Sequence, residues 1–390
     1  MRGAEAKAVG ELTGDALSGA TLLVRDVHAA IARRAFAAAG PGAGRARVVH
    51  DRVSGAVYAG VRATLGAVPR GAGSVLAARA RADALSIADS SRGALALAAV
   101  NACAGDGLAE RGSPLALEMT LRRHGAELAL ASLGDITGRV AIFIHGLGET
   151  DAAWRLGATP ERPGYGEQLQ RELGYTAIEL RYNTGRHISD NGRALSLLLD
   201  RLRSVEEIAL IGHSMGGLVA RSACHYGRGG EHAWTNALTN VVCLGSPHLG
   251  APLEKGVNLL GWALDRAPET RPFARVLNGR SAGIKDLRFG ACIEEEWCDC
   301  DPDELLADRC RDVPFLPGAR FCFVAATVGP DPVGFLVGDL IVRASSASGR
   351  GRTRRIPFGA DDGCRLAGLT HFGLLNHPAV YQQIRAWLAR

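Results

Sequence analysis

One short stretch near the middle of the chain restricts its possible folds more than any other. It runs from Glu207 to Ala220 and reads EIALIGHSMGGLVA. An apolar run of strand length breaks at Gly212, presents Ser214, and resumes after Gly216 as small residues with helical spacing. A serine on a tight turn between a strand and a helix is the pattern of a nucleophile elbow. Glycines flank such a serine because the strand and helix backbones approach closely around it. The stretch therefore predicts Ser214 as a nucleophile at the end of a buried strand.

The same pattern occurs a second time, so the match alone is weak evidence. With 50 glycines and 18 serines in 390 residues, chance alone gives about 0.3 such matches. The second match places Ser281 between Gly279 and Gly283. No apolar run precedes Ser281, and we interpret it as part of a surface turn. The strand before Ser214 and the helix after it make Ser214 the candidate nucleophile.

Apolar runs of strand length recur along the chain and alternate with helical stretches. Two alternating segments, 115–121 and 127–131, flank a polar turn and predict a β-hairpin. Further strands are expected at 140–144, 175–180, 207–211, 241–244 and 321–325. Helical stretches such as 168–172 and 192–202 separate most of them. The pattern predicts an α/β fold, in which an initial hairpin leads into a mostly parallel sheet with helices on both faces.

The rest of the chain is expected to form a helical extension and an insertion. Residues 1–110 are rich in Ala, Gly and Arg, and helical periodicity covers about 21–36, 53–65 and 72–97. We expect them to form a helical N-terminal extension to a catalytic domain at 111–390. Between about 250 and 318 the alternation of strands and helices lapses, although 259–264 is apolar and helical. An insertion of this length predicts a lid or cap.

Charge and composition exclude some classes of partner. The formal net charge is +5, and all but three of the 45 basic residues are arginine. The arginines are dispersed rather than clustered with aromatic residues, so no nucleic-acid partner is expected. We interpret the arginine run at 350–355 as a solvated loop, with an anionic lipid surface as the alternative. The oligomeric state stays open.

The cysteine content and the lengths of the apolar segments bear on the cellular compartment of the protein. Nine cysteines occur without a recognisable signal peptide or a bilayer-spanning stretch, which predicts a cytoplasmic protein with free thiols. Peripheral contact with a membrane is the alternative. Four cysteines lie close together in the sequence: Cys292, Cys298, Cys300 and Cys310. Their spacing matches no standard zinc site and no histidine lies among them, so no metal or cofactor is expected.

An activated serine needs a base that follows it in the chain of this fold. His371 lies on the loop before the last helix, which begins near Pro378, and it is the candidate base. His377 directly precedes this proline, so it is expected to cap the helix instead. Three other histidines follow the serine, and of these we expect His225 and His232 to lie on the surface.

The base needs an acid that holds its ring in place. Asp339 follows the expected strand 321–325 and heads an apolar turn. Asp331 is the competing residue, but it is flanked by prolines and is typical of a turn. We therefore predict Asp339 as the acid.

The oxyanion needs two backbone N–H donors. One is expected from Met215, which follows the nucleophile, and the other from Leu147 in the loop after strand 140–144. We expect the substrate to contact residues around these groups, namely His145, Gly146, Trp154, His213 and His248.

Five segments carry a resemblance to a known superfamily. They are FIHGLG at 143–148, YNTGRHIS at 182–189, GHSMGG at 212–217, LGSPHLG at 244–250 and HFGLLNHP at 371–378. Together they resemble the serine esterase and lipase branch of the α/β-hydrolase superfamily. They are most similar to bacterial proteins of the GPI inositol-deacylase and triacylglycerol-lipase groups. The resemblance covers about 115–390, and its single-glycine oxyanion loop implies medium or long acyl chains.

We therefore expect a hydrolase of carboxylic esters. Ser214, His371 and Asp339 would act through an acyl-enzyme, without a cofactor. One alternative is an acyltransferase with the same triad, and another is a non-catalytic scaffold that binds through its N-terminal helices. A third is membrane remodelling by residues 1–110. Acyl length and alcohol moiety stay open.

Overall fold

The computed structural model describes residues 1–330, 337–352 and 354–390. The chain forms two compact units, each discontinuous in sequence. The first unit comprises Met1–Ala94, Gly112–Leu115 and Gly256–Arg280, and the second comprises Leu95–Arg111, Ala116–Lys255 and Ser281–Arg390. Our expected division into 1–110 and 111–390 stays a prediction. None of the helices formed by the described residues combines the length and apolarity needed to span a bilayer.

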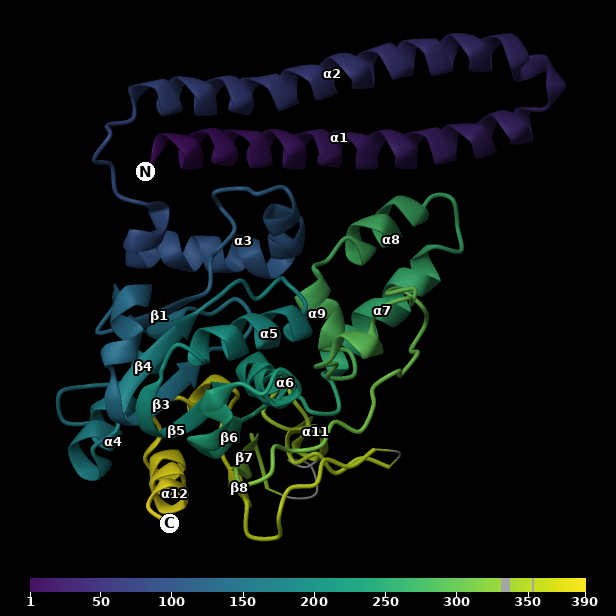
Figure 1. Ribbon diagram of the computed structural model, residues 1–390. Helices are drawn as coiled ribbons and strands as arrows, with labels where there is room; N and C mark the ends of the chain where they lie inside the picture. Colours follow the sequence, from purple (N-terminus) through teal and green to yellow (C-terminus); the bar gives the residue numbers. More distant parts are fainter. Residues whose placement is uncertain (331–336, 353) are drawn as a thin grey trace. The chain divides into compact units, whose positions relative to one another are not determined.

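The second unit is built on one mixed sheet (Figure 1). Its strands are β1 (Thr120–Arg123), β2 (Ala126–Glu127), β3 (Thr137–Ile144), β4 (Thr176–Arg181), β5 (Ser204–His213), β6 (Leu238–Leu244), β7 (Arg320–Thr327) and β8 (Gly363–Ala367). Their order is β2-β1-β4-β3-β5-β6-β7-β8. β1 is antiparallel to both of its neighbours, whereas β4, β3, β5, β6, β7 and β8 are parallel. The α/β fold class predicted from the sequence is confirmed.

The strand order reverses beside β3. The chain passes from β3 to β4 on one side, then returns to place β5 on the other side of β3. Connections that leave in opposite directions open a crevice at the carboxyl ends of the two strands. The loop after β3 and the turn after β5 both begin at these carboxyl ends, where Ile144 pairs with Gly212.

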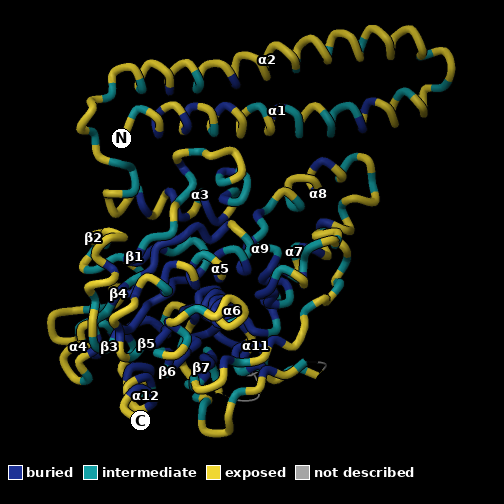
Figure 2. Tube along the Cα trace, in the orientation of Figure 1, coloured by how far each residue is buried: buried dark blue, intermediate teal, exposed yellow. Residues whose placement is uncertain are grey.

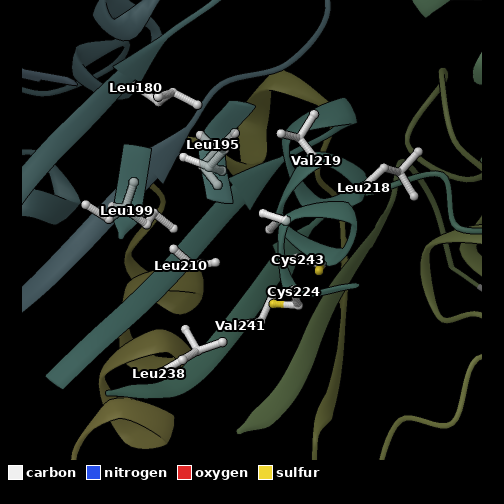
Figure 3. Close-up of a cluster of buried hydrophobic side chains, with 14 of the residues drawn as sticks. Leu180, Leu195, Leu199, Leu210, Leu218, Val219, Cys224, Leu238, Val241 and Cys243 are labelled. Carbon is white, nitrogen blue, oxygen red and sulfur yellow. The ribbon is translucent and has the colours of Figure 1, made fainter. Parts of the chain in front are cut away.

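Helices cover both faces of the sheet. They include α4 (Tyr165–Leu173), α5 (Ile188–Leu199), α6 (Met215–Gly229) and α12 (Pro378–Leu388). Successive residues of a strand point to opposite faces, so Ile142 packs in the core with α5 and α6, while Phe143 packs with α4 and α12. In Figure 3, Leu195 of α5 and Val219 of α6 gather with Leu210 of β5. Each such fully buried side chain stabilises the fold by roughly 1.5–3 kcal/mol. Figure 2 shows this burial on both sides of the central strands.

Two features of the sheet differ from expectation, namely the length of the hairpin and an additional strand. The hairpin is shorter than predicted, because β1 begins only at Thr120 and the segment after β2 turns into the 3₁₀ helix Leu130–Asp135. Strand β8 was not predicted. It is the last strand of the sheet, and its residues alternate between exposed and half-buried, with Arg365 at the centre. An edge strand with this composition lacks the apolar run that identified the others.

The first unit is helical. Helices α1 (Gly3–Ala39) and α2 (Gly44–Arg79) form an antiparallel hairpin that we call the helical hairpin. They approach closely at Gly10, where an added Cβ would lie 2.9 Å from the Cα of Gly73. α2 continues through Pro69, so the expected break between 65 and 72 is absent, and the expected helix over 72–97 is divided between α2 and α3 (Ser91–Glu110).

The segment between β6 and β7 contains three α-helices. They are α7 (Pro252–Leu264), α8 (Arg271–Asn278) and α9 (Ala282–Asp286). The apolar helical stretch predicted at 259–264 lies in α7. Residues 256–280 belong to the first unit, where Arg275 of α8 pairs with Asp26 of α1 at 3.0 Å. Whether this segment acts as a lid stays a prediction.

Candidate active site

Ser214 lies on the sharp turn between β5 and α6. Its backbone has φ 53° and ψ −123°, a conformation that only a tightly held non-glycine residue adopts. A Cβ added to Gly216 would lie 2.1 Å from the carbonyl oxygen of Ile144, and one on Gly212 would lie 2.4 Å from the nitrogen of Gly217. Any side chain at these two positions would therefore force strand and helix apart. The structure has the local geometry that the sequence pattern indicates.

His371 and Asp339 form a buried hydrogen-bonded pair. His371 Nδ1 donates to Asp339 Oδ2 at 2.8 Å, and the backbone N–H of His371 donates to the Asp339 carbonyl at 3.0 Å. The other carboxylate oxygen accepts from the amides of Ile341 and Val342 at 3.0 and 2.7 Å. The apolar turn after Asp339 therefore fixes the carboxylate, and the carboxylate fixes the ring. This arrangement leaves Nε2 of His371 to exchange a proton.

Two contacts place this pair beside the elbow. His213, the residue before Ser214, donates from Nε2 to the carbonyl of His371 at 3.2 Å, and the two rings lie 4.7 Å apart. A Cβ on Gly245 would lie 3.3 Å from both Asp339 Oδ2 and His371 Nδ1. The residue before Gly245 accepts the Ser214 N–H at 2.8 Å. The structure thus brings the three predicted catalytic residues into one region, and their roles stay predictions.

A buried ion pair that the sequence did not reveal supports this region. His213 Nδ1 lies 2.9 Å from Glu149 Oε1, and Glu149 Oε2 accepts the Gly146 N–H at 2.7 Å. Burial favours the neutral acid, but His213 and the Gly146 amide outweigh it and lower the pKa of Glu149 to about 2. Burial lowers the pKa of His213, and Glu149 more than compensates, so this pKa is raised. Both ring nitrogens face acceptors, which favours the protonated form of His213.

The loop after β3 leaves one N–H free beside the serine. The amides of Gly146 and Gly148 donate to Glu149 Oε2 at 2.7 Å and Thr184 Oγ1 at 3.2 Å. The N–H of Leu147, between them, donates to no acceptor in the described part of the chain. Met215 is the first residue of α6, so its N–H has no partner within the helix. Gly146 lies against the nucleophile, because its added Cβ would be 2.9 Å from the Ser214 Cβ. The two amides are suited to an oxyanion.

Two residues expected to bind substrate make contacts inside the protein. The ring of His145 stacks on Tyr182 with centroids 4.5 Å apart, and its Nδ1 lies 2.9 Å from the Gly146 carbonyl. Trp154 is 4% exposed and packs edge-on against Phe143 at 5.0 Å. These contacts order the loop and the crevice wall, and direct contact with substrate stays a prediction.

His248 is also enclosed by protein. It is fully buried, with Nδ1 3.2 Å from a nitrogen of Arg221 and its ring 5.1 Å from that of Phe358. Burial, with two nearby guanidinium groups, holds the pKa of His248 well below its usual value. His248 is therefore a neutral residue in the wall of the loop after β6.

The second serine motif was misjudged. Ser281 is 1% exposed, so it is not in a surface turn. Its hydroxyl donates to the carbonyl of Ala102 at 2.5 Å and caps the N-terminus of α9. No residue near Ser281 in the sequence indicates its burial, because its hydrogen-bond partner Ala102 lies 179 positions away.

Three further expectations have different outcomes. His377 caps α12 as predicted, since its side chain accepts the N–H of Ala379. The basic run at 350–355 was interpreted as a solvated loop, which is wrong for Arg354, a half-buried residue that donates to the carbonyl of His248 at 2.9 Å. The competing acid, Asp331, lies outside the described residues. Among the described residues, no group of three or more His, Cys, Asp or Glu is placed to hold a metal ion.

The parallel sheet, the crevice beside β3 and the serine on a strand-to-helix turn define an α/β-hydrolase domain. Residues 135–263 match the family described as the PGAP1-like alpha/beta domain, and the resemblance inferred from the sequence is confirmed. A comparison with curated proteins finds no match.

Several solved structures are similar to this chain. The mature lipase BlEst2 of Bacillus licheniformis is 18% identical, with a TM-score of 0.40 over 64% of this chain and 91% of that chain. A lipase-esterase related protein from Clostridium acetobutylicum is 12% identical, with a TM-score of 0.35. The match covers 64% of this chain and 94% of that chain. Phospholipase PlaB from Legionella pneumophila is 17% identical, with a TM-score of 0.38. The match covers 65% of this chain and 60% of that chain. Similarity at these identities and scores carries no information about the substrate.

Proposed function

We propose that this protein is a serine hydrolase of carboxylic esters. The observation that carries the proposal is the buried His371–Asp339 pair, held at 2.8 Å beside the strained turn of Ser214. A strained serine next to an oriented imidazole is the arrangement that activates a hydroxyl for attack on a carbonyl. The free amides of Leu147 and Met215 support the same reaction, because they would hold the developing oxyanion.

In the proposed reaction, the Ser214 hydroxyl attacks the ester carbonyl and gives its proton to Nε2 of His371. The imidazolium then returns the proton to the departing alkoxide, so the alcohol leaves and an acyl-enzyme remains. Water, activated by the same imidazole, attacks the acyl carbonyl and releases the acid together with free Ser214. Asp339 keeps the tautomer with the proton on Nδ1 and stabilises the imidazolium throughout.

The surroundings of the base suit this role near neutral pH. Burial lowers the pKa of His371, the charged His213 lowers it further, and Asp339 opposes both, so the pKa lies below the usual 6.5. The ring is therefore neutral and ready to accept a proton at pH 7. The ion pair of His213 and Glu149 positions the base and the oxyanion loop without contacting the reacting atoms.

A pair of serine variants tests the proposal. Ser214→Ala is expected to abolish turnover of p-nitrophenyl esters and labelling by a fluorophosphonate. Ser281→Ala is the matched control, since it removes the other motif serine. It is expected to keep full labelling while losing about 1 kcal/mol of stability with its helix cap. Continued labelling of the folded Ser214→Ala chain would rule out the proposed nucleophile.

A second measurement would narrow the range of possible substrates. A series of esters of increasing acyl length, with and without a lipid interface, would give the acyl preference. Added alcohol would reveal transfer, because an acyltransferase would form a new ester in place of the free acid. Free acid as the sole product under these conditions supports hydrolysis.

A further inference from the structure

A row of exposed apolar side chains runs along helix α2. It advances by four residues at all but one step, and we call it the apolar row. Its members are Val49, Val53, Val57, Val61, Leu65, Val68, Ala72 and Leu76. The valine and leucine members are between 38% and 64% exposed. Because neighbours three or four residues apart lie on one side of a helix, the row forms a continuous apolar strip on a helix whose other flank packs against α1.

The same helix is strongly cationic. α2 contains six arginines and one aspartate, which gives a net charge of +5 with histidine neutral. Four of these arginines, Arg45, Arg52, Arg62 and Arg79, are exposed. None of the four makes an ion pair with a described carboxylate, whereas Arg70 pairs with Asp15 of α1. The excess positive charge of α2 is therefore not neutralised within the helical hairpin.

A basic hollow lies on the same hairpin. It has a volume of about 230 Å³. The charged and titratable residues that line it are Arg25, Arg33, Arg47, His28, His50, Asp51 and Tyr58. Arg25 pairs with the neighbouring Asp26 at 2.7 Å and Arg47 with Asp51 at 3.6 Å, while Arg33 has no carboxylate partner among the described residues. Three guanidinium groups around a hollow of this size suit a phosphate group.

We propose that the helical hairpin docks on an anionic lipid surface through α2. Valine and leucine side chains of the apolar row enter the boundary between headgroups and acyl chains. The unpaired arginines bind lipid phosphates at the same depth, and the basic hollow holds one more headgroup. An apolar strip flanked by arginines is the pattern of helices that lie in the plane of a membrane surface.

Charge and spacing favour lipid over a second copy of the chain. Two α2 helices brought together would each carry a charge of +5, so they would repel, whereas an anionic bilayer attracts them. A helix dimer also needs two alternating columns with a period of 3.5 residues. From Val49 to Leu65 the apolar row advances in uninterrupted steps of four residues, so this half does not repeat with that period.

The test uses the full chain carrying Ser214→Ala, so that vesicle lipids are not consumed and binding is measured independently of ester hydrolysis. Flotation is compared for vesicles of phosphatidylcholine alone and of phosphatidylcholine mixed with phosphatidylglycerol. We expect binding to the mixed vesicles, weakened by salt, and little binding to phosphatidylcholine alone.

Two aspartate variants distinguish the contribution of the apolar row to vesicle binding from the contribution of net charge. Val57→Asp lies in the row, whereas Val48→Asp lies nine residues away on the opposite side of the same helix. The two valines are 57% and 52% exposed, and both substitutions change the charge equally. Val48→Asp is expected to weaken binding about fivefold through charge alone. Val57→Asp is expected to weaken it at least ten times more, since it places a carboxylate among acyl chains.

Arginine variants test the electrostatic part without altering the row. Replacing Arg45, Arg52, Arg62 and Arg79 by Gln is expected to weaken vesicle binding about fivefold for each residue replaced. The single variant Arg33→Gln, in the basic hollow, is expected to weaken binding about fivefold as well. Equal effects of Val57→Asp and Val48→Asp would overturn the proposal, as would equal binding to both kinds of vesicle. A lipid-free dimer that Val57→Asp dissociates, without flotation of the parent chain, would overturn it in favour of a second copy.

Discussion

The ion pair between Glu149 and His213 provides the sharpest prediction of the structure. Glu149→Gln keeps the size of the side chain and one oxygen that accepts the Gly146 N–H. It removes the negative charge 2.9 Å from His213, which is fully buried. A protonated imidazole would then be buried without its counter-ion, or it would lose its proton and its hydrogen bond.

The size of the effect follows from the pKa of Glu149. Lowering it from 4.5 to about 2 corresponds to about 3 kcal/mol of folding free energy near neutral pH. This is a large part of the 5–15 kcal/mol that stabilises an ordinary domain. For a unit of this size we expect Tm to fall by roughly 6–12 °C.

The effect should depend on pH in both directions. The folded-state pKa of Glu149 is depressed, so its contribution is present above pH 4.5 and is lost as pH falls towards 2. The folded-state pKa of His213 is raised, so its contribution is present below pH 6.5 and is lost as pH rises through the raised value. The difference in Tm between the parent chain and Glu149→Gln should therefore be largest between pH 4.5 and pH 6.5, where both contributions are present.

Thermal unfolding followed by circular dichroism across the pH range would measure this difference. Glu206→Gln is the matched control, because Glu206 is exposed on β5 and its loss should leave Tm nearly unchanged. If Glu149→Gln behaved like the control, or if its effect were independent of pH, the assignment of a charged pair would be wrong. We also expect kcat to fall, since Glu149 holds the oxyanion loop.

Three other variants or conditions have defined outcomes. Asp339→Asn is expected to lower kcat by about 10⁴ with KM nearly unchanged, and a mild loss in ester turnover would argue against Asp339 as the acid. The acidic limb of kcat/KM should have its midpoint below pH 6.5, because burial lowers the pKa of His371, and a midpoint above 6.5 in a pH–rate profile would contradict this. Gly216→Ala is expected to cost at least about 3 kcal/mol or to prevent folding, since its Cβ would lie 2.1 Å from a carbonyl oxygen. Gly229→Ala in open space of the same helix should leave urea unfolding unchanged or slightly strengthened.

The parts of the site that were predictable are those whose geometry is local. The Ser214 turn leaves a local pattern, because the close approach of Gly212 to Gly217 lies within six residues of sequence. The cap made by His377 is equally local. Apolar strands such as β3 and β5 were identified because burial on both faces leaves a continuous apolar run.

The parts that escaped prediction depend on distant residues. Glu149 meets His213 across 64 positions, and nothing near Glu149 in sequence distinguishes it from a surface acid. Ser281 is covered by a carbonyl far upstream, so its burial leaves no trace nearby. Pro69 normally ends a helix, yet α2 continues through it in the packed hairpin.

The discontinuity of the first unit has a consequence for how the protein is made. Asp26 of α1 pairs with Arg275 of α8, which is synthesised 249 residues later. At 5–20 residues per second, this interval lasts roughly 12–50 seconds. During that time the sheet as far as β6 leaves the ribosome, while the helical hairpin waits for its last segment. A nascent chain held before Arg275 should therefore be more sensitive to protease in residues 1–94 than the completed protein.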